Sequence, residues 1–194
     1  MSWTQLIELL AALTGVAYVV LEILQKNAMW VVGIVTGAAC AVSFGAQHVW
    51  ASMGLNVYYV VVSVIGLVHW RRDGAAVGEG EIHLNPLSRK TAVWSAVAFV
   101  LGSLAFMQLL RLLGGNASRL DAMATVLSVI ATWWLVRSYL PQWLLWVVAD
   151  VLSTFLCLQT GQYLMAGMYL AYCLSAVYGY MHWKKRGKIV HLPE

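Results

Sequence analysis

Seven apolar runs dominate the chain, and each is long enough to cross a lipid bilayer as a helix. They cover approximately residues 4–24, 29–46, 51–70, 91–113, 120–138, 142–159 and 162–183. A bilayer core of about 30 Å needs roughly 20 helical residues. Only 10% of the residues are charged and 61% are hydrophobic. The sequence therefore predicts an all-α membrane protein of seven transmembrane helices, with no room for a separate catalytic domain. The first run lacks the basic start and the cleavage site of a signal peptide, so we expect it to span the membrane.

The basic residues are distributed unevenly between the two sides of the predicted membrane. Of the 12 lysines and arginines, 10 fall on one side and 2, Arg111 and Arg119, on the other. Cytoplasmic loops carry the excess of Lys and Arg, so the N-terminus is predicted outside and the C-terminus inside. The net charge of +4 belongs to these loops and does not indicate nucleic-acid binding. The three cysteines form no CxxC pair, so we expect neither a disulfide framework nor a metal site, and no cofactor.

The two ends of the chain align without a gap when one is shifted by 113 residues. The matched pairs are Trp30 with Trp143, Gly54 with Gly167, Tyr59 with Tyr172, Gly66 with Gly179, and His69–Trp70 with His182–Trp183. Helices 1–3 and 5–7 are therefore predicted to be copies, with helix 4 as a connector. Each copy has three helices, and the connector adds one more crossing of the membrane. The two copies therefore enter the membrane from the same side, which gives a 3+1+3 parallel repeat. In such repeats the substrate site lies near the midplane between the copies. Duplicated helices that only form a scaffold are the alternative.

This repeat divides the chain into four predicted parts. Residues 1–70 form the first three-helix repeat, and residues 71–116 form a cytoplasmic loop and the connector helix. Residues 117–183 form the second repeat, and residues 184–194 form a cytoplasmic tail. The loop at 71–90 is polar and glycine-rich, and it is the one obvious linker.

The main candidate site lies on the sixth helix. Trp143, Trp146 and Asp150 are spaced i, i+3 and i+7, so they share one helix face. An ionisable residue near mid-span normally faces the bundle interior or a water-filled cavity. Asp150 could instead form a helix–helix hydrogen bond, and the tryptophans could instead belong to an interfacial belt. Both alternatives remain open from the sequence.

Further candidates on neighbouring helices would complete a substrate site. They are Asn56 and Tyr59 on the third helix, Thr132 on the fifth, and Tyr169 and Tyr172 on the seventh. Aromatic planes with a few hydrogen-bonding groups suit a flat ring that carries a ribose. A carboxylate adds a preference for a cation, which Trp and Tyr faces also attract.

These motifs resemble the PnuC family of bacterial vitamin transporters over nearly the whole chain. The most specific element is "WLLW", Trp143 to Trp146, which is similar to the family's WxxW motif. "GLNVYY…G…HW" in the third helix, "Asp121…Thr125…Ser128" and "Arg137" also match the family pattern. Some nicotinamide riboside members carry an amide where this chain has Asp150, and some carry an Asn near Tyr178.

The resemblance implies a full-length relative of the SWEET transporters in the bacterial inner membrane. The implied activity is facilitated diffusion of nicotinamide riboside, which a cytoplasmic kinase then traps by phosphorylation. Trp143 and Trp146 would line the cytoplasmic side of the substrate cavity. The implied partners are the vitamin substrate and the lipid bilayer, and a homo-oligomer is left open.

Other functions remain as alternatives to riboside transport. Thiamine is also a permanent cation with an aromatic ring, so it is the close alternative substrate. A membrane subunit of an ATP-driven vitamin importer is more remote. An intramembrane enzyme would need Asp121 and Asp150 as an acid pair, but they lie on different helices at different depths. No HExxH, GxSxG or phosphate-binding glycine loop occurs, so we expect no catalytic residue.

Overall fold

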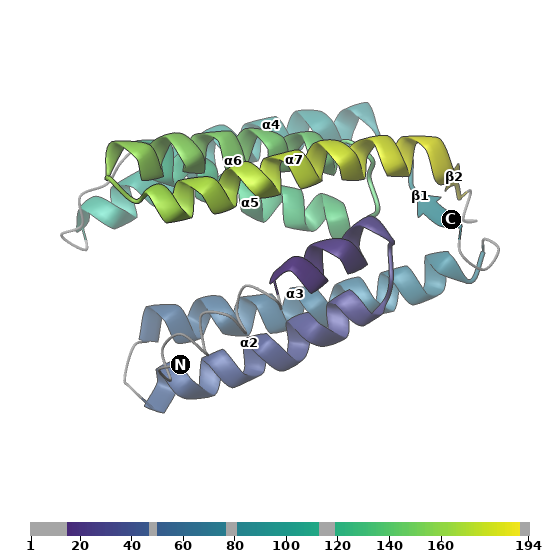
Figure 1. The fold of residues 1–194 in the computed structure, drawn as a ribbon, viewed down its shortest axis with the longest axis horizontal. Helices are drawn as coiled ribbons and strands as arrows, with labels where there is room; N and C mark the ends of the chain where they lie inside the picture. The colour runs from purple at the N-terminus through teal and green to yellow at the C-terminus, as the bar shows by residue number, and fades with distance from the viewer. Residues whose placement is uncertain (1–14, 47–49, 77–80, 113–118, 191–194) are drawn as a thin grey trace. The chain divides into compact units, whose positions relative to one another are not determined.

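The computed structural model describes residues 15–46, 50–76, 81–112 and 119–190 (Figure 1). Residues 15–23 are helical, and the remainder of the predicted first helix lies outside the described residues. The other helices are α2 (Ala28–Ala46), α3 (Trp50–Gly74), α4 (Arg89–Leu112), α5 (Arg119–Val136), α6 (Gln142–Gln159) and α7 (Tyr163–Arg186). Two short strands, β1 (Ile82–Leu84) and β2 (Gly187–Ile189), complete the elements. Each predicted helix thus has a helical counterpart in the described part of the chain.

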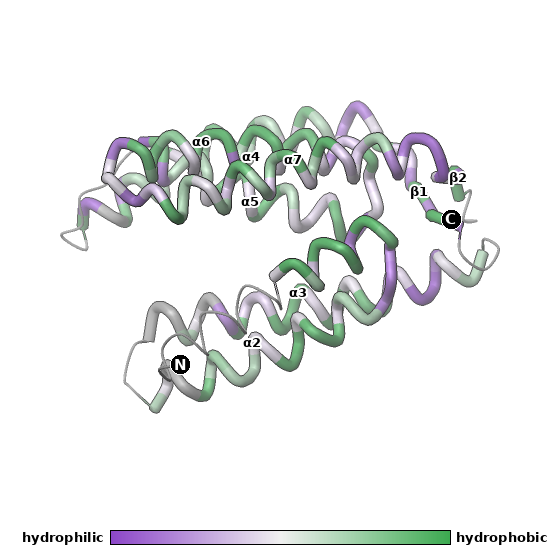
Figure 2. The backbone as a smooth tube through the Cα atoms, viewed as in Figure 1, coloured by the Kyte–Doolittle hydropathy of each residue, from purple (hydrophilic) through white to green (hydrophobic). Residues whose placement is uncertain are grey.

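Two helices extend beyond their predicted ends into charged sequence. The predicted ends were residues 70 and 183, whereas α3 continues to Gly74 and α7 to Arg186. Their last turns contain basic residues, Arg71 and Arg72 in α3 and Lys184, Lys185 and Arg186 in α7. Positive charge at a helix C-terminus interacts favourably with the helix dipole. Figure 2 shows these hydrophilic ends beyond the apolar parts of both helices.

The chain divides into two compact units, and the boundary along the sequence falls between Ile82 and His83. In the first unit, α2 packs against α3. In the second unit, α5 packs against both α4 and α6, and α6 packs against α7. The predicted division has four parts, with two repeats, a connector and a tail, whereas the structure separates two units. The four-part division therefore stays a prediction.

Each unit has a tryptophan pair in its helix packing. In the first unit, Trp30 of α2 lies edge-on to Trp70 of α3, with ring centroids 5.1 Å apart and an interplanar angle of 80°. In the second unit, Trp143 of α6 meets Trp183 of α7 in the same way, at 5.3 Å and 90°. All four side chains are almost fully buried. Edge-to-face geometry is favourable because the positive ring edge meets the negative ring face.

A glycine makes room for each pair. A methyl group on Gly66 would lie 2.6 Å from ring carbons of Trp30, and one on Gly179 would lie 2.6 Å from ring carbons of Trp143. Any side chain at these positions would force the indole to move. The residues of the two clusters are separated by the 113-residue offset found in the sequence.

A small sheet that was not predicted pairs part of the linker before α4 with the segment after α7. β1 and β2 pair as a two-stranded sheet. Val190 continues the pairing, since its N–H donates to the carbonyl oxygen of Leu84 at 2.9 Å. Part of the polar linker therefore has regular structure, and so does the start of the predicted tail.

Four helices in the described residues are long and apolar enough to cross a membrane. They comprise Arg89–Leu109 of α4, all of α5 and α6, and Tyr163–Arg186 of α7. A shorter apolar stretch, Ala28–Val42, lies within α2. The architecture is that of a helical membrane protein, as predicted.

Candidate functional site

The candidate site begins at the first turn of α6, where Trp143 is fixed by packing. Its side chain is only 2% exposed and lies between Gly179 and Trp183 of α7. An interfacial belt residue would face outward, so the belt alternative does not fit this burial. The indole Nε1 of Trp143 nevertheless has no hydrogen-bond partner among the described residues.

Trp146 lies one turn further along α6 and has a different environment. Its side chain is half-buried, and no partner ring is recorded for it in the described part of the chain. Its Nε1 atom is buried and has no hydrogen-bond partner there. A buried tryptophan N–H usually finds an acceptor. Trp146 therefore offers an unused donor as well as an aromatic face.

Asp150 follows Trp146 by one turn and is buried, with 7% of its side chain exposed. Tyr169 and Cys173 of α7 lie close enough to interact electrostatically with its carboxyl group. The backbone carbonyl of Asp150 accepts a hydrogen bond from the hydroxyl of Thr154 at 2.7 Å. A carboxyl group with so little contact with solvent is a costly feature that indicates a specific role.

The first unit has glycines where the second has these two side chains. In the alignment of the two repeats at an offset of 113 residues, Gly33 corresponds to Trp146 and Gly37 corresponds to Asp150. A methyl group on Gly33 would lie 2.7 Å from the hydroxyl oxygen of Ser63, and one on Gly37 would lie 3.0 Å from the Val60 side chain. In the first unit these positions serve close helix packing, and in the second they carry an indole and a carboxyl group.

Three further candidates lie in the second unit. Tyr169 and Tyr172 form an edge-to-face pair on α7 with centroids 6.5 Å apart, and both are half-buried. Thr132 of α5 is half-buried, and its hydroxyl donates to the backbone carbonyl of Ser128 at 2.8 Å. Its donor is therefore used within its own helix, while its oxygen can still accept a hydrogen bond.

The remaining candidates, Asn56 and Tyr59, belong to α3 in the first unit. Asn56 is half-buried, and Tyr59 is 45% exposed with its ring 5.6 Å from that of Tyr58. The structure thus places six of the eight candidates in the second unit and two in the first. Each group belongs to a single unit.

Gln142 is a candidate that sequence reasoning missed. It is the first residue of α6 and is fully buried, yet neither amide atom has a hydrogen-bond partner among the described residues. A buried amide without partners is unfavourable by about 1–3 kcal/mol. Gln142 follows Pro141 at the end of a loop, a position that is usually exposed. Its burial could therefore not be predicted from the sequence.

Among the described residues, no group of three or more His, Cys, Asp or Glu side chains could hold a metal ion. The candidate set on α6 and α7 holds groups of other kinds. It combines aromatic faces, unused N–H donors and one buried carboxyl group.

Comparison with known proteins gives a consistent result. The family described as Nicotinamide mononucleotide transporter matches residues 5–185. The nicotinamide riboside transporter PnuC of Haemophilus influenzae is 28% identical over 186 residues, covering 95% of this chain and 80% of that protein. PnuC of Neisseria mucosa is also 28% identical, over 90% of this chain and 70% of that protein.

A solved structure supports the same assignment. The crystal structure of the Vitamin B3 transporter PnuC matches with a TM-score of 0.66 and 26% identity, covering 90% of this chain and 79% of that one. The resemblance seen in the WLLW motif and the third helix is thereby confirmed. Because the family match covers nearly the whole chain, this multi-pass membrane protein belongs to the nicotinamide mononucleotide transporter family, the family of the PnuC transporters.

Proposed function

We propose that this protein carries nicotinamide riboside across the bacterial inner membrane by facilitated diffusion. The observation that carries the proposal is the pairing of Trp146 with Asp150 on one face of α6. Trp146 has an unused N–H donor, and Asp150 is a buried carboxyl group. Nicotinamide riboside has a permanently cationic pyridinium ring, and both indole faces and carboxylates attract cations. The curated relatives are named for the same substrate.

The buried carboxyl group favours the riboside over the mononucleotide. The mononucleotide differs by a phosphate group, which carries negative charge. The residues that interact electrostatically with Asp150 from α7 are Tyr169 and Cys173, and neither is basic. A phosphate near this carboxyl group would be repelled by it, and no basic side chain forms an ion pair with Asp150 among the described residues. The cationic riboside has no such penalty.

We propose that the full site also includes Trp143, Asn56, Tyr59, Tyr169, Tyr172 and Thr132. Trp143 is held by Gly179 and Trp183, so its contribution is a fixed ring and one unused N–H. The polar side chains of the other residues would meet the ribose hydroxyls and the carboxamide. Gln142 joins this set because its buried amide has no partner in the described part of the chain.

We further propose a 3+1+3 parallel repeat of the kind known from the SWEET transporters. The two tryptophan clusters, with their glycines at the same 113-residue offset, support it. In such repeats the substrate site lies at the interface between copies, near the membrane midplane. The first copy has Gly33 and Gly37 at the positions where the second copy has Trp146 and Asp150. This difference supports the second copy as the source of the aromatic and charged contacts with the substrate.

The proposed orientation places the N-terminus outside and the C-terminus in the cytoplasm. The basic ends of α3 and α7 support this, because cytoplasmic segments are enriched in Lys and Arg. A substrate that enters by diffusion must be removed to sustain uptake. Phosphorylation by a cytoplasmic kinase would do so, because the proposed site does not favour the phosphorylated product.

Uptake into liposomes that contain only this protein tests the proposal. We expect entry of nicotinamide riboside to equilibrium, weaker entry of the mononucleotide, and no requirement for ATP. Thiamine serves as the competing cation. Preferential uptake of thiamine would identify thiamine as the substrate and would leave facilitated diffusion as the mechanism. Absence of uptake without an ATPase partner would favour a subunit of an ATP-driven importer and would contradict the proposal.

A further inference from the structure

A hollow lies between α4 and α5 in the second unit, and none of its lining residues is among those proposed to hold the substrate. Its volume is about 350 Å³. Lys90, Thr91 and Ser95 supply its polar lining, and Trp94, Ile130 and Trp133 supply most of its apolar lining. The two tryptophans are largely exposed, at 63% and 42%. Neither indole is part of the core packing described above.

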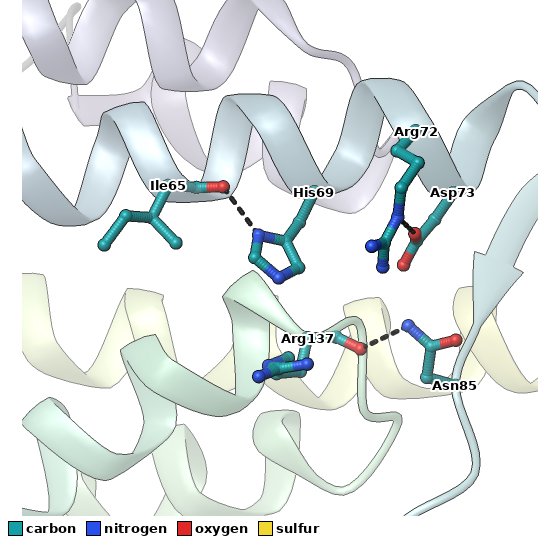
Figure 3. A network of polar contacts seen from close by, with 6 residues as sticks. All are labelled: Ile65, His69, Arg72, Asp73, Asn85 and Arg137. Carbon is teal, nitrogen blue, oxygen red and sulfur yellow. Dashed lines mark hydrogen bonds and ion pairs between the residues drawn. The ribbon is translucent and has the colours of Figure 1, made fainter. Parts of the chain in front are cut away.

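Three hydrogen bonds hold α4 and the loop before it against α5 and the residues that follow it. The Asn85 side chain donates to the backbone carbonyl of Arg137 at 2.9 Å (Figure 3), and the Asn85 N–H donates to the carbonyl of Ser138 at 3.2 Å. Further along, the indole N–H of Trp134 donates to the hydroxyl of Ser95 at 3.0 Å. The hollow is therefore built into the fold of the second unit.

The rim of the hollow is basic, because Lys90 lines it and Arg89 and Arg137 neighbour its lining residues Lys90 and Trp133. Arg89 and Lys90 occupy the first turn of α4, where no acidic residue is present. The helix dipole is already positive at this end, so the two cations add to an unfavourable potential. The Arg137 guanidinium lies 5.2 Å from the ring centroid of Trp133. Neither Lys90 nor Arg137 has a carboxylate partner among the described residues. An anion at the rim would relieve this potential.

The walls of the hollow continue into an apolar helix face. Arg89–Leu109 of α4 is long and apolar enough to cross a membrane, and none of that stretch is buried in the protein. Val93, Val97 and Leu101 are among its exposed side chains. The basic rim stands at the end of this span, which is the depth of lipid headgroups. Basic pockets between helices at this depth suit anionic headgroups.

We propose that the hollow binds one anionic phospholipid. Its phosphate would lie between Lys90 and Arg137 and accept a hydrogen bond from Thr91. An acyl chain would lie against Trp94 and Ile130 and continue along the exposed face of α4. A phospholipid combines negative charge with a long apolar chain, which matches the rim and the walls together. A free phosphate would use the rim alone, and a second copy of the chain would need no anion.

Native mass spectrometry of the full-length protein tests this proposal. The protein in detergent is titrated with phosphatidylglycerol or phosphatidylcholine. We expect phosphatidylglycerol to be retained preferentially, and Lys90→Gln to reduce this retention about fivefold, the effect of one basic charge near a membrane surface. Arg111→Gln is the matched control, because it removes an exposed charge from the last turn of the same helix. It should leave retention unchanged.

A second variant separates the lipid from the other occupants. Trp94→Ala removes an exposed apolar wall and should weaken retention of phosphatidylglycerol with an unchanged melting temperature. Glycerol 1-phosphate, the soluble headgroup alone, should fail to compete at millimolar concentration. The proposal is overturned by equal retention of the two lipids, by equal losses in Lys90→Gln and Arg111→Gln, or by competition from the soluble phosphate. Dissociation of an oligomer in Trp94→Ala would instead identify a second copy as the occupant. None of these results bears on the transported substrate.

Discussion

Trp143 stands edge-on to Trp183, with ring centroids 5.3 Å apart and planes at 90°. The indole of Trp143 therefore belongs to the packing of α6 against α7. Trp146, one turn later, has no such ring partner in the described residues and retains an unused N–H. Of the two tryptophans of the WLLW motif, Trp143 thus combines helix packing with its place in the proposed site, whereas Trp146 is not held by a second ring.

Gly179→Ala should destabilise the protein by about 1–3 kcal/mol, the usual cost of overpacking. The added methyl group would lie 2.6 Å from two ring carbons of Trp143 and 2.7 Å from a third, and would force the indole to move. The melting temperature of the purified protein in detergent measures the effect. Gly167→Ala is the matched control on the same helix, because its added methyl group would contact no atom of another element within 4 Å in the described part of the chain. Equal melting temperatures for the two variants would show that the Trp143 contact is not tight.

Trp146→Ala should weaken binding of nicotinamide riboside by about 1–3 kcal/mol, the loss expected for an aromatic ring that stacks and holds a cation. Its effect on stability should be small, because the side chain is only half-buried. Trp143→Ala should show the opposite balance, with a larger loss of stability. Calorimetric titration and melting curves of both variants measure the two effects. Wild-type affinity in a folded Trp146→Ala variant would remove the stacking role.

Most of the fold could be predicted because bilayer thickness sets the length of each helix. The predicted run 142–159 coincides with α6, and the other described helices differ from their predictions by a few residues at the ends. The ends differ because Arg71, Arg72 and the basic residues after Trp183 extend the helices out of the apolar layer. The β1–β2 sheet could not be predicted, since strands of three residues carry too short a pattern to detect.

The candidate site was only partly predictable, because sequence spacing fixes a helix face but not its neighbours. The spacing of Trp143, Trp146 and Asp150 correctly placed them on one helix. It could not reveal that Gly179 makes room for the indole of Trp143. The burial of Gln142 depends on packing by elements distant in sequence, so the local pattern around Pro141 concealed it.

Transport should proceed without coupling to protons, sodium or ATP. Among the described residues, no hydrogen bond or ion pair joins the Asp150 side chain to a second ionisable side chain, although Tyr169 interacts electrostatically with both Asp150 and Asp121. Asp150 therefore has no direct partner for a proton relay in this part of the chain. In proteoliposomes, an imposed proton or sodium gradient should leave the final level of nicotinamide riboside at equilibrium with the outside. The control is the same vesicles with the gradient collapsed by an ionophore. Accumulation above equilibrium that depends on the gradient would show coupling.

Asp150→Asn should weaken binding of the cationic riboside while sparing a neutral analogue of the same shape. The two side chains are nearly isosteric, so the packing of α6 against α7 should survive. Dihydronicotinamide riboside, in which the reduced ring carries no positive charge, is a suitable neutral ligand. We expect a loss of about 1 kcal/mol for the cation, the worth of a partly screened charge contact. Calorimetric titration of both ligands against wild type and variant measures the difference. A helix-tying role for Asp150 predicts instead a lower melting temperature and equal losses for both ligands. Equal losses would therefore remove the counter-charge role and leave Asp150 as a structural residue beside Trp146.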